Sequence, residues 1–176
     1  MYKRQTNYNA LTGVSAGNFA IAQVSAIRYS NVGPFTYDGT AHGPAVSFAG
    51  STGATTTNYV GVSLGYNSVN APTNPGTYYV SNTLAGDANY EGTTNSQPFT
   101  INPALLTILA NNGAKLYGQT QTFAGTEFTL LNPLYGSDSV TSVTLTSAGS
   151  AAGAPTGNYP ISVSYTHLTL PTIYSV

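Results

Sequence analysis

Hydrophobic and polar residues alternate with a period of two along much of the chain, as in β-strands that bury one face. From Tyr78 to Leu84, every second residue would face one side of a sheet, and the tyrosine, serine and threonine between them would face the other. Similar short runs, bounded by Gly, Pro, Asn and Asp, occur elsewhere. They contain Val46 and Phe48, Val60, Val62 and Leu64, Phe99 and Ile101, Leu106 and Ile108, and Val143 and Leu145. The pattern predicts an all-β fold.

Two Asx-Gly pairs mark corners between the predicted strands. Asp38-Gly39 and Asn112-Gly113 combine residues that tolerate positive φ, as tight hairpins and loop corners require. No segment of about twelve or more residues combines helical periodicity with capping signals. We therefore expect at most one helical turn, near residues 137–142.

Two motifs recur at nearly the same spacing. Phe19 precedes Phe99 by 80 residues, and Tyr78 precedes Tyr159 by 81 residues. A fixed period of this kind is the signature of a tandem array of structural units. The chain is therefore expected to contain repeated modules.

The repeat divides the chain unequally. We interpret residues 6–22 as the last strand of a preceding module, 23–102 as a complete module and 103–162 as a truncated second module. The truncated module lacks a counterpart of the stretch DANYEGTTNSQPFTI, residues 87–101. We expect the sequence to be a fragment of a longer array.

Both ends of the chain resemble a translated sequencing adapter. The stretch VSYTHLTLPT, residues 163–172, resembles one orientation of a transposase mosaic end, and MYKRQ, residues 1–5, resembles the opposite orientation. We therefore expect residues 1–5 to be an adapter artefact and residues 163–176 an adapter-derived tail.

Charge is scarce throughout the chain. Charged residues make up 5% of the sequence and the net charge is −1, whereas soluble proteins average about 25% charged residues. Because the chain has no cluster of Lys or Arg, we predict that it binds neither nucleic acid nor anionic membranes. The sequence also contains no cysteine, which excludes disulfides and zinc–thiolate sites. No apolar run is long enough to span a membrane in this fragment.

Three stretches resemble the MBG and YDG-type repeat modules of large bacterial surface adhesins, including filamentous-haemagglutinin-like proteins. They are FTYDGTAHGPAVSF, NPGTYYVSNTLAGDANYEGTTNSQPFTI and LLTILANNGAKLYGQTQTFAGTEFTL. The resemblance implies extracellular all-β modules in tandem, Ig-like or similar, with no catalytic residues. It gives structural roles to the motif residues Tyr37, Asp38, Gly39, Thr40, Gly76, Tyr78, Asn89, Tyr90, Lys115, Tyr117 and Gly118.

The candidate chemical groups each lack the partners that their chemistry needs. His42 follows a turn, and neither a metal-ligand cluster nor a positioned nucleophile accompanies it. Asp87 and Glu91 offer fewer oxygens than calcium requires, so we expect Asp87 to form an Asx-turn and Glu91 to be a solvated charge. We predict no metal, cofactor or catalytic site.

Lys115 raises the question of an intramolecular amide crosslink to an asparagine. That reaction needs a buried carboxylic acid, and the sequence alone does not place Glu127 or Asp138 beside the lysine. The simpler interpretation is an exposed strand lysine that discourages pairing at a sheet edge.

These patterns lead to one expected fold and two functional hypotheses. We expect tandem small antiparallel β-sandwiches, Ig-like, with β-grasp-like packing as the alternative. The first hypothesis is a non-catalytic spacer of a bacterial cell-surface adhesin, whose partners are neighbouring modules of the same chain. The second is a module that binds a host or cell-surface glycan or protein through exposed tyrosines.

Overall fold

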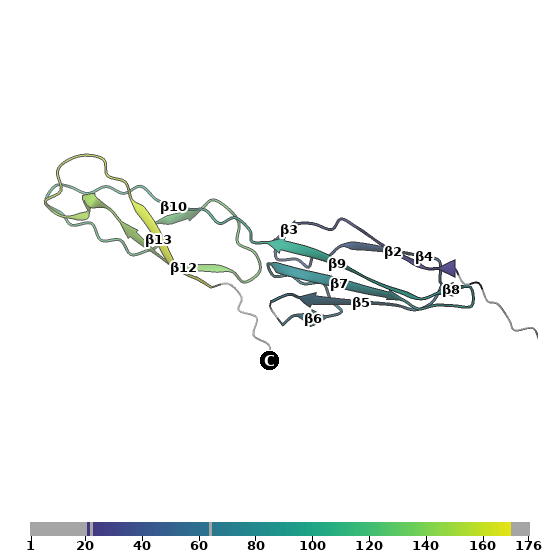
Figure 1. The fold of residues 1–176 in the computed structure, drawn as a ribbon. Coiled ribbons are helices and arrows are strands. Elements are labelled where there is room, and N and C mark those ends of the chain that lie inside the picture. The colour runs from purple at the N-terminus through teal and green to yellow at the C-terminus, as the bar shows by residue number, and fades with distance from the viewer. Residues whose placement is uncertain (1–20, 22, 64, 170–176) are drawn as a thin grey trace, which may run out of the picture.

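The computed structural model describes residues 21–169 apart from residues 22 and 64. In this part of the chain, thirteen strands and one turn of 3₁₀-helix form two lobes that lie end to end (Figure 1). The prediction of an all-β fold is confirmed. The adapter-like residues 1–5 and nearly all of the predicted orphan strand, residues 6–22, lie outside the described residues.

The first lobe is built on a five-stranded sheet with the order β3-β9-β7-β5-β6. Strand β7 lies at its centre and pairs antiparallel with β9 on one side and β5 on the other. The shorter strands β6 and β3 continue the sheet outward. The strands are β3 (Phe35–Thr36), β5 (Thr55–Gly61), β6 (Asn67–Ser68), β7 (Gly76–Leu84) and β9 (Thr93–Asn102).

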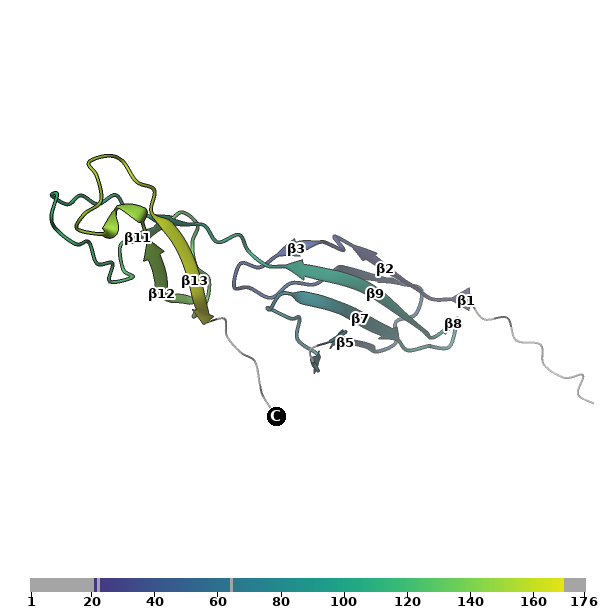
Figure 2. The same cartoon turned by 60° about the vertical axis from the view of Figure 1, so that its left-hand side comes forward.

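A smaller layer packs on this sheet. Strands β2 (Ala26–Ser30) and β4 (Ala45–Ala49) pair antiparallel, and β2 contacts both β7 and β9. At the opposite end of the lobe from the second lobe, β1 (Gln23–Val24) pairs with β8 (Tyr90–Glu91) (Figure 2). The lobe therefore consists of two packed layers, closed at one end by a short strand pair.

Two of these pairings are parallel, which corrects the expectation of purely antiparallel sheets. Strand β1 runs parallel to β8, and β3 runs parallel to β9. Each pairing involves two residues of each strand. A two-residue strand is too short to leave a periodic pattern in the sequence.

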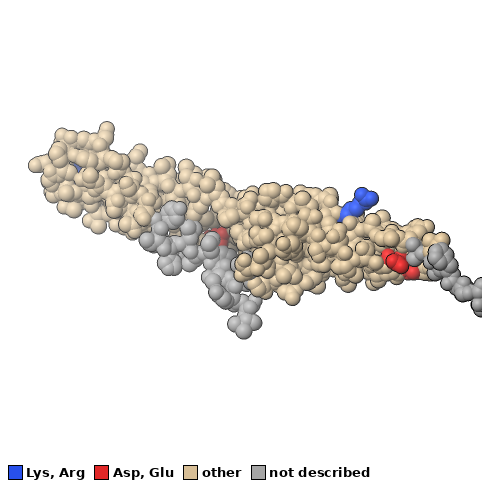
Figure 3. Space-filling model, in the orientation of Figure 1, with Lys and Arg blue, Asp and Glu red and all other residues tan. Residues whose placement is uncertain are grey.

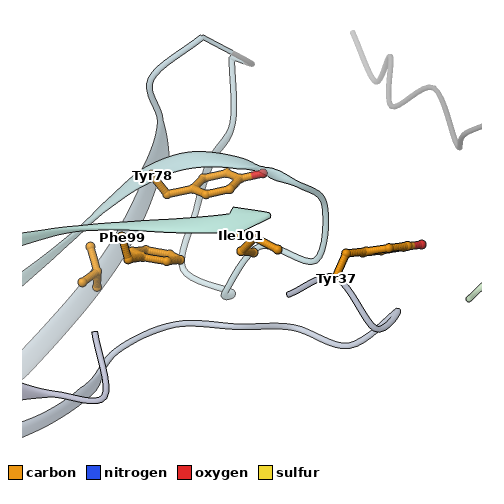
Figure 4. Close-up of a cluster of buried hydrophobic side chains, with 5 residues drawn as sticks. Tyr37, Tyr78, Phe99 and Ile101 are labelled. Atoms are coloured by element: carbon orange, nitrogen blue, oxygen red, sulfur yellow. The ribbon is translucent and has the colours of Figure 1, made fainter. Parts of the chain in front are cut away.

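The core of the first lobe follows the predicted alternation. Tyr79 is 47% exposed, whereas its inward-facing neighbours along β7 are at most 1% exposed. Phe99 and Ile101 of β9 are also buried, and the Phe99 ring stacks on Tyr78 with 5.5 Å between centroids (Figure 4). The inward-facing residues of β7 are Tyr78, Val80, Asn82 and Leu84.

The second lobe contains two separate strand pairs. Strands β10 (Ile108–Ala110) and β11 (Phe128–Leu130) are antiparallel, as are β12 (Ser139–Thr146) and β13 (Ser162–Thr169). The 3₁₀ turn η1 (Ala148–Ser150) follows β12. It is the only helical turn among the described residues, in agreement with the predicted limit of one turn, but it lies at residues 148–150 and not near residues 137–142.

The pairing of β10 with β11 repeats that of β2 with β4. In the first lobe Ile27 lies opposite Phe48. In the second lobe, Ile108 lies opposite Leu130. Ile108 follows Ile27 by 81 positions, and Leu130 follows Phe48 by 82 positions. The two neighbouring residue pairs keep these offsets. The two lobes thus share the register of this strand pair.

Strand β13 includes part of the adapter-like tail. Residues 163–169 were expected to lie outside the module, but they pair with β12 in a two-stranded sheet. The rest of the tail, residues 170–176, lies outside the described residues.

The two predicted Asx-Gly corners differ in the structure. Gly39 has φ of +80° at a loop corner between β3 and β4. Gly113 lies in the long loop between β10 and β11, where the positive φ values belong to Gly118 and Gly125 instead. Asn112-Gly113 is therefore part of a loop whose sharp bends lie elsewhere.

Candidate functional site

The Tyr-Asp-Gly-Thr motif forms a closed turn after β3. Oδ1 of Asp38 accepts hydrogen bonds from the Thr40 hydroxyl at 2.6 Å and from the Thr40 backbone N–H at 2.9 Å. The same oxygen lies 2.9 Å from Nε2 of His42. The hydroxyl and N–H of Thr40, followed by His42, hold the pKa of Asp38 below its ordinary value. The motif thus builds a rigid Asx-type turn.

His42 serves this turn and the neighbouring packing. Its ring stacks on Phe35, with 5.2 Å between ring centroids and 20° between planes. Within the described residues, no three His, Cys, Asp or Glu side chains come together in a way that could hold a metal ion.

The turn after β3 also touches the second lobe. The Tyr37 ring meets Tyr135 edge to face, with 5.9 Å between centroids and 85° between planes. A Cβ added to Gly39 would lie 3.3 Å from the backbone nitrogen of Gly136, so the two loops approach closely. We call Tyr37, Gly39, Tyr135, Gly136 and Asp138 the joint.

The joint is continuous with the core of the first lobe. Tyr37 is 8% exposed, belongs to the same buried cluster as Tyr78 and Phe99, and directs its hydroxyl away from both (Figure 4). Tyr135 packs against this cluster from the second lobe, and Ala104 does so from the connection between β9 and β10. The second lobe is therefore seated on the end of the first lobe's core.

An acidic side chain completes the joint. Burial raises the pKa of Tyr37, and the charge of Asp138 and a hydrogen bond with its carboxylate raise it further. The Oδ1 atom of Asp138 is itself buried and has no hydrogen-bond partner in the structure. The phenol therefore stays neutral at physiological pH.

The other motif residues lie outside the joint, in strands, turns and loops of both lobes. Gly76 and Tyr78 belong to β7, and Tyr90 to β8. The Asn89 N–H donates to Asp87, so it belongs to the Asx-turn predicted for that residue. In the second lobe, Tyr117 is 72% exposed and contributes to no described core. Of the motif residues singled out in the sequence, Tyr37 and Gly39 are the ones that reach the joint.

Asp87 joins two loops at the far end of the first lobe. One carboxylate oxygen accepts from the backbone N–H of Thr52 at 2.8 Å and from its hydroxyl at 3.1 Å. The other accepts from the N–H groups of Asn89 and Tyr90, each at 2.9 Å. These bonds, led by that from the Thr52 backbone, hold the pKa of Asp87 far below its ordinary value. Both oxygens are therefore occupied by protein donors.

We expect Asp87→Asn to destabilise the first lobe at neutral pH and to reduce its sensitivity to acid. Because the pKa of Asp87 is lowered in the folded state, its stabilisation is present above the unfolded pKa of about 4 and is lost as pH falls below that value. Urea unfolding between pH 3 and 7 measures the effect. Glu91→Gln, which changes an exposed acid of the same segment, is the matched control. An equal acid-induced loss of stability in wild type and Asp87→Asn would contradict this role.

Lys115 does not occupy the predicted position. It lies in a loop, partly buried, and its Nζ donates to the carbonyl oxygens of Gln119 at 3.0 Å and Ala151 at 2.9 Å. The prediction of an exposed strand lysine is therefore wrong. The Glu127 carboxylate instead accepts from backbone N–H groups of residues 124–126, which lower its pKa. The groups needed for an amide crosslink do not converge.

The exposed tyrosines of the described residues lie apart. Tyr79 is 47% exposed on β7 of the first lobe, and Tyr117 is 72% exposed in the second. The remaining described tyrosines are partly or fully buried. The exposed rings therefore do not form a shared stacking platform.

Comparisons with protein-family models, with curated proteins and with solved structures find no match to this chain. The helical structure of the described residues does not reach the length and hydrophobicity of a membrane-spanning helix. The assignment of function depends on the geometry of the joint and on the arrangement of the lobes.

Proposed function

We propose that the chain is a structural spacer, a piece of a tandem array of β-modules from a large bacterial cell-surface adhesin. The observation that carries this proposal is the joint. It fixes two lobes end to end by seating Tyr135 of one on the core of the other (Figure 1). An array joined in this way gains length with each module.

The internal repeat supports the modular part of the proposal. The shared register of β2–β4 and β10–β11 agrees with the period seen in the sequence. We propose an Ig-like sandwich for each module, since the first lobe has two packed strand layers. The β-grasp alternative needs a helix across one sheet, and the described residues of the first lobe contain strands and loops.

The surface is suited to a passive role. In the view of Figure 3 it is largely uncharged, with a few isolated acidic and basic side chains. Exposed side chains of the sheet are mostly Thr, Ser and Asn. Such a surface limits nonspecific ionic attraction. Glycan or protein binding through tyrosines has weaker support because Tyr79 and Tyr117 lie on different lobes.

Small-angle scattering on the monomeric chain tests the spacer proposal. A compact protein of this length has a radius of gyration of about 16 Å, and we expect a clearly larger value. In residual dipolar couplings, both lobes should share one alignment tensor. Tyr135→Ala should give two independent tensors because the joint is loosened, whereas Tyr117→Ala, an exposed tyrosine of the same lobe, should not. A radius near that of a compact protein would refute the proposal.

A further inference from the structure

The second lobe encloses a large open hollow. Its volume is about 910 Å³, and it is lined by both polar and apolar side chains from three parts of the lobe. The first lobe has seven buried hydrophobic residues among those described, whereas the second has Val143 and Leu145. Side chains around the hollow include Ile108, Ala110, Phe123, Tyr159, Ile161 and Val163. Among the described residues, the second lobe therefore has a smaller buried core than the first lobe.

Tyr159 relates the hollow to the core of the first lobe. Its hydroxyl donates to the carbonyl of Pro155, four residues earlier, at 3.0 Å. Tyr78, 81 residues before it, makes the same bond to Asn74 at 2.8 Å. Tyr78 is covered by Phe99 of β9, whereas the Tyr159 ring faces the hollow. The hollow thus lies where a counterpart of β9 would lie.

The stretches before Tyr37 and Tyr117, which are equivalent in the repeat, also differ in how they are covered. Strand β3, which ends one residue before Tyr37, is held by parallel pairing with β9. The corresponding stretch before Tyr117 is not a strand, and Leu116 and Tyr117 are 73% and 72% exposed, against 8% for Tyr37. No described strand pairs beside these side chains as β9 does beside Tyr37 in the first lobe.

Within the described part of the chain, the strand next to the hollow has an unpaired edge. Strand β13 pairs with β12 in a two-stranded sheet, whereas β7 is paired on both sides, with β5 and with β9. An unpaired strand edge beside a hollow can accept another strand through main-chain hydrogen bonds and side-chain pockets.

The chain itself contains a segment whose sequence resembles that of β8 and β9. Residues 7–22 repeat the β8–β9 motif, with Asn7-Tyr8 matching Asn89-Tyr90 and Phe19 matching Phe99. This segment directly precedes β1, which lies at the end of the first lobe remote from the second lobe (Figure 2). To reach the hollow of its own chain, this segment would have to fold back along the first lobe. The same segment of a second copy can reach the hollow directly.

We propose that residues 7–22 of one copy insert as a β-strand into the second lobe of another copy, with Phe19 filling the hollow against Tyr159. This inference rests on the repeat organisation of the proposed spacer. The contact is head to tail, so every assembly that does not close into a ring keeps one free donor and one free acceptor and can add further copies.

Sedimentation of the full 176-residue chain over a range of concentrations tests the insertion. We expect association into open-ended oligomers, weakened at least about tenfold in Phe19→Ser because a buried aromatic ring is lost. Ala20→Thr is the matched control, since Thr100 occupies this position in β9, and it should associate like wild type. A chain that stays monomeric, or that associates equally with Phe19→Ser, would overturn the proposal.

Cross-linking tests the register. Thr77 lies opposite Thr100 in the first lobe, so Asn158 of one copy should lie opposite Ala20 of another. Because the chain has no cysteine, a mixture of Asn158→Cys and Ala20→Cys should give a mixed dimer with a short thiol cross-linker. Gly13→Cys in place of Ala20→Cys should not, and equal cross-linking from both positions would contradict the insertion.

The two proposals fail in different ways. A compact radius of gyration for the monomer would remove the spacer function whatever the oligomers do. An elongated monomer that does not associate through Phe19 would leave the spacer function in place and remove only the insertion.

Discussion

Replacing Tyr78 by alanine is expected to cost about 3–5 kcal/mol, the range measured for buried aromatic residues. Tyr78 is 1% exposed, stacks on Phe99 and meets Tyr66 edge to face at 5.8 Å. Its hydroxyl also donates to the carbonyl of Asn74. Domains of this size have a total stability of about 5–15 kcal/mol, so the variant should be partly or fully unfolded in the first lobe.

Tyr79→Ala is the matched control, because the neighbouring ring is 47% exposed on the opposite face of β7. It should cost about 1 kcal/mol or less. Tyr78→Phe separates the hydroxyl from the ring and should cost about 1 kcal/mol. Urea unfolding and hydrogen exchange of the β7 and β9 amides measure these differences. Similar losses in Tyr78→Ala and Tyr79→Ala would contradict the burial of Tyr78.

The second large effect is expected at Gly53. A Cβ at this position would overlap the carbonyl oxygen of Ala85 and lie 2.7 Å from its carbonyl carbon. Around this contact, the Ser51 hydroxyl donates to the Ala85 carbonyl at 2.6 Å and Thr52 donates to Asp87 at 2.8 Å. Gly53→Ala should force these loops apart and cost about 1–3 kcal/mol, as overpacking does.

Gly113→Ala is the control for this substitution. A Cβ at Gly113 would meet no atom within 4 Å, and its φ is not positive. It should be neutral or slightly stabilising, because alanine reduces the entropy of the unfolded chain. Thermal unfolding of both variants checks the difference. A Gly53→Ala variant as stable as Gly113→Ala would show that the two loops can separate without loss.

The long strands could be predicted because each of their residues faces either the core or the surface. In β7 the inward face carries Tyr78 and Val80, and the outward face carries Tyr79. A period of two is therefore visible over the whole strand. Even the polar Asn82 follows this alternation, because it is buried and its amide donates to the Thr57 hydroxyl at 2.7 Å.

The joint could be predicted only in part. The sequence singled out Tyr37 and Gly39 as motif residues, and Gly39 as a corner. Their partners Tyr135 and Gly136 lie almost 100 residues later and carry no periodic signal, because the contact depends on how one lobe is seated on another. The position of Lys115 was missed for a related reason. Its partners are backbone carbonyls in a distant loop, and carbonyls have no sequence signature.

The positions of β1 and β9 determine how the first lobe would carry tension. The chain enters the first lobe through β1 at one end and leaves it through β9 at the other (Figure 2). A pull between these points runs along the strands, so the ladder between β9 and β7, with paired residues from Gly76 to Leu84, is loaded in shear. Its hydrogen bonds must then yield together and not one after another, which makes the lobe resistant to stretching along its own axis.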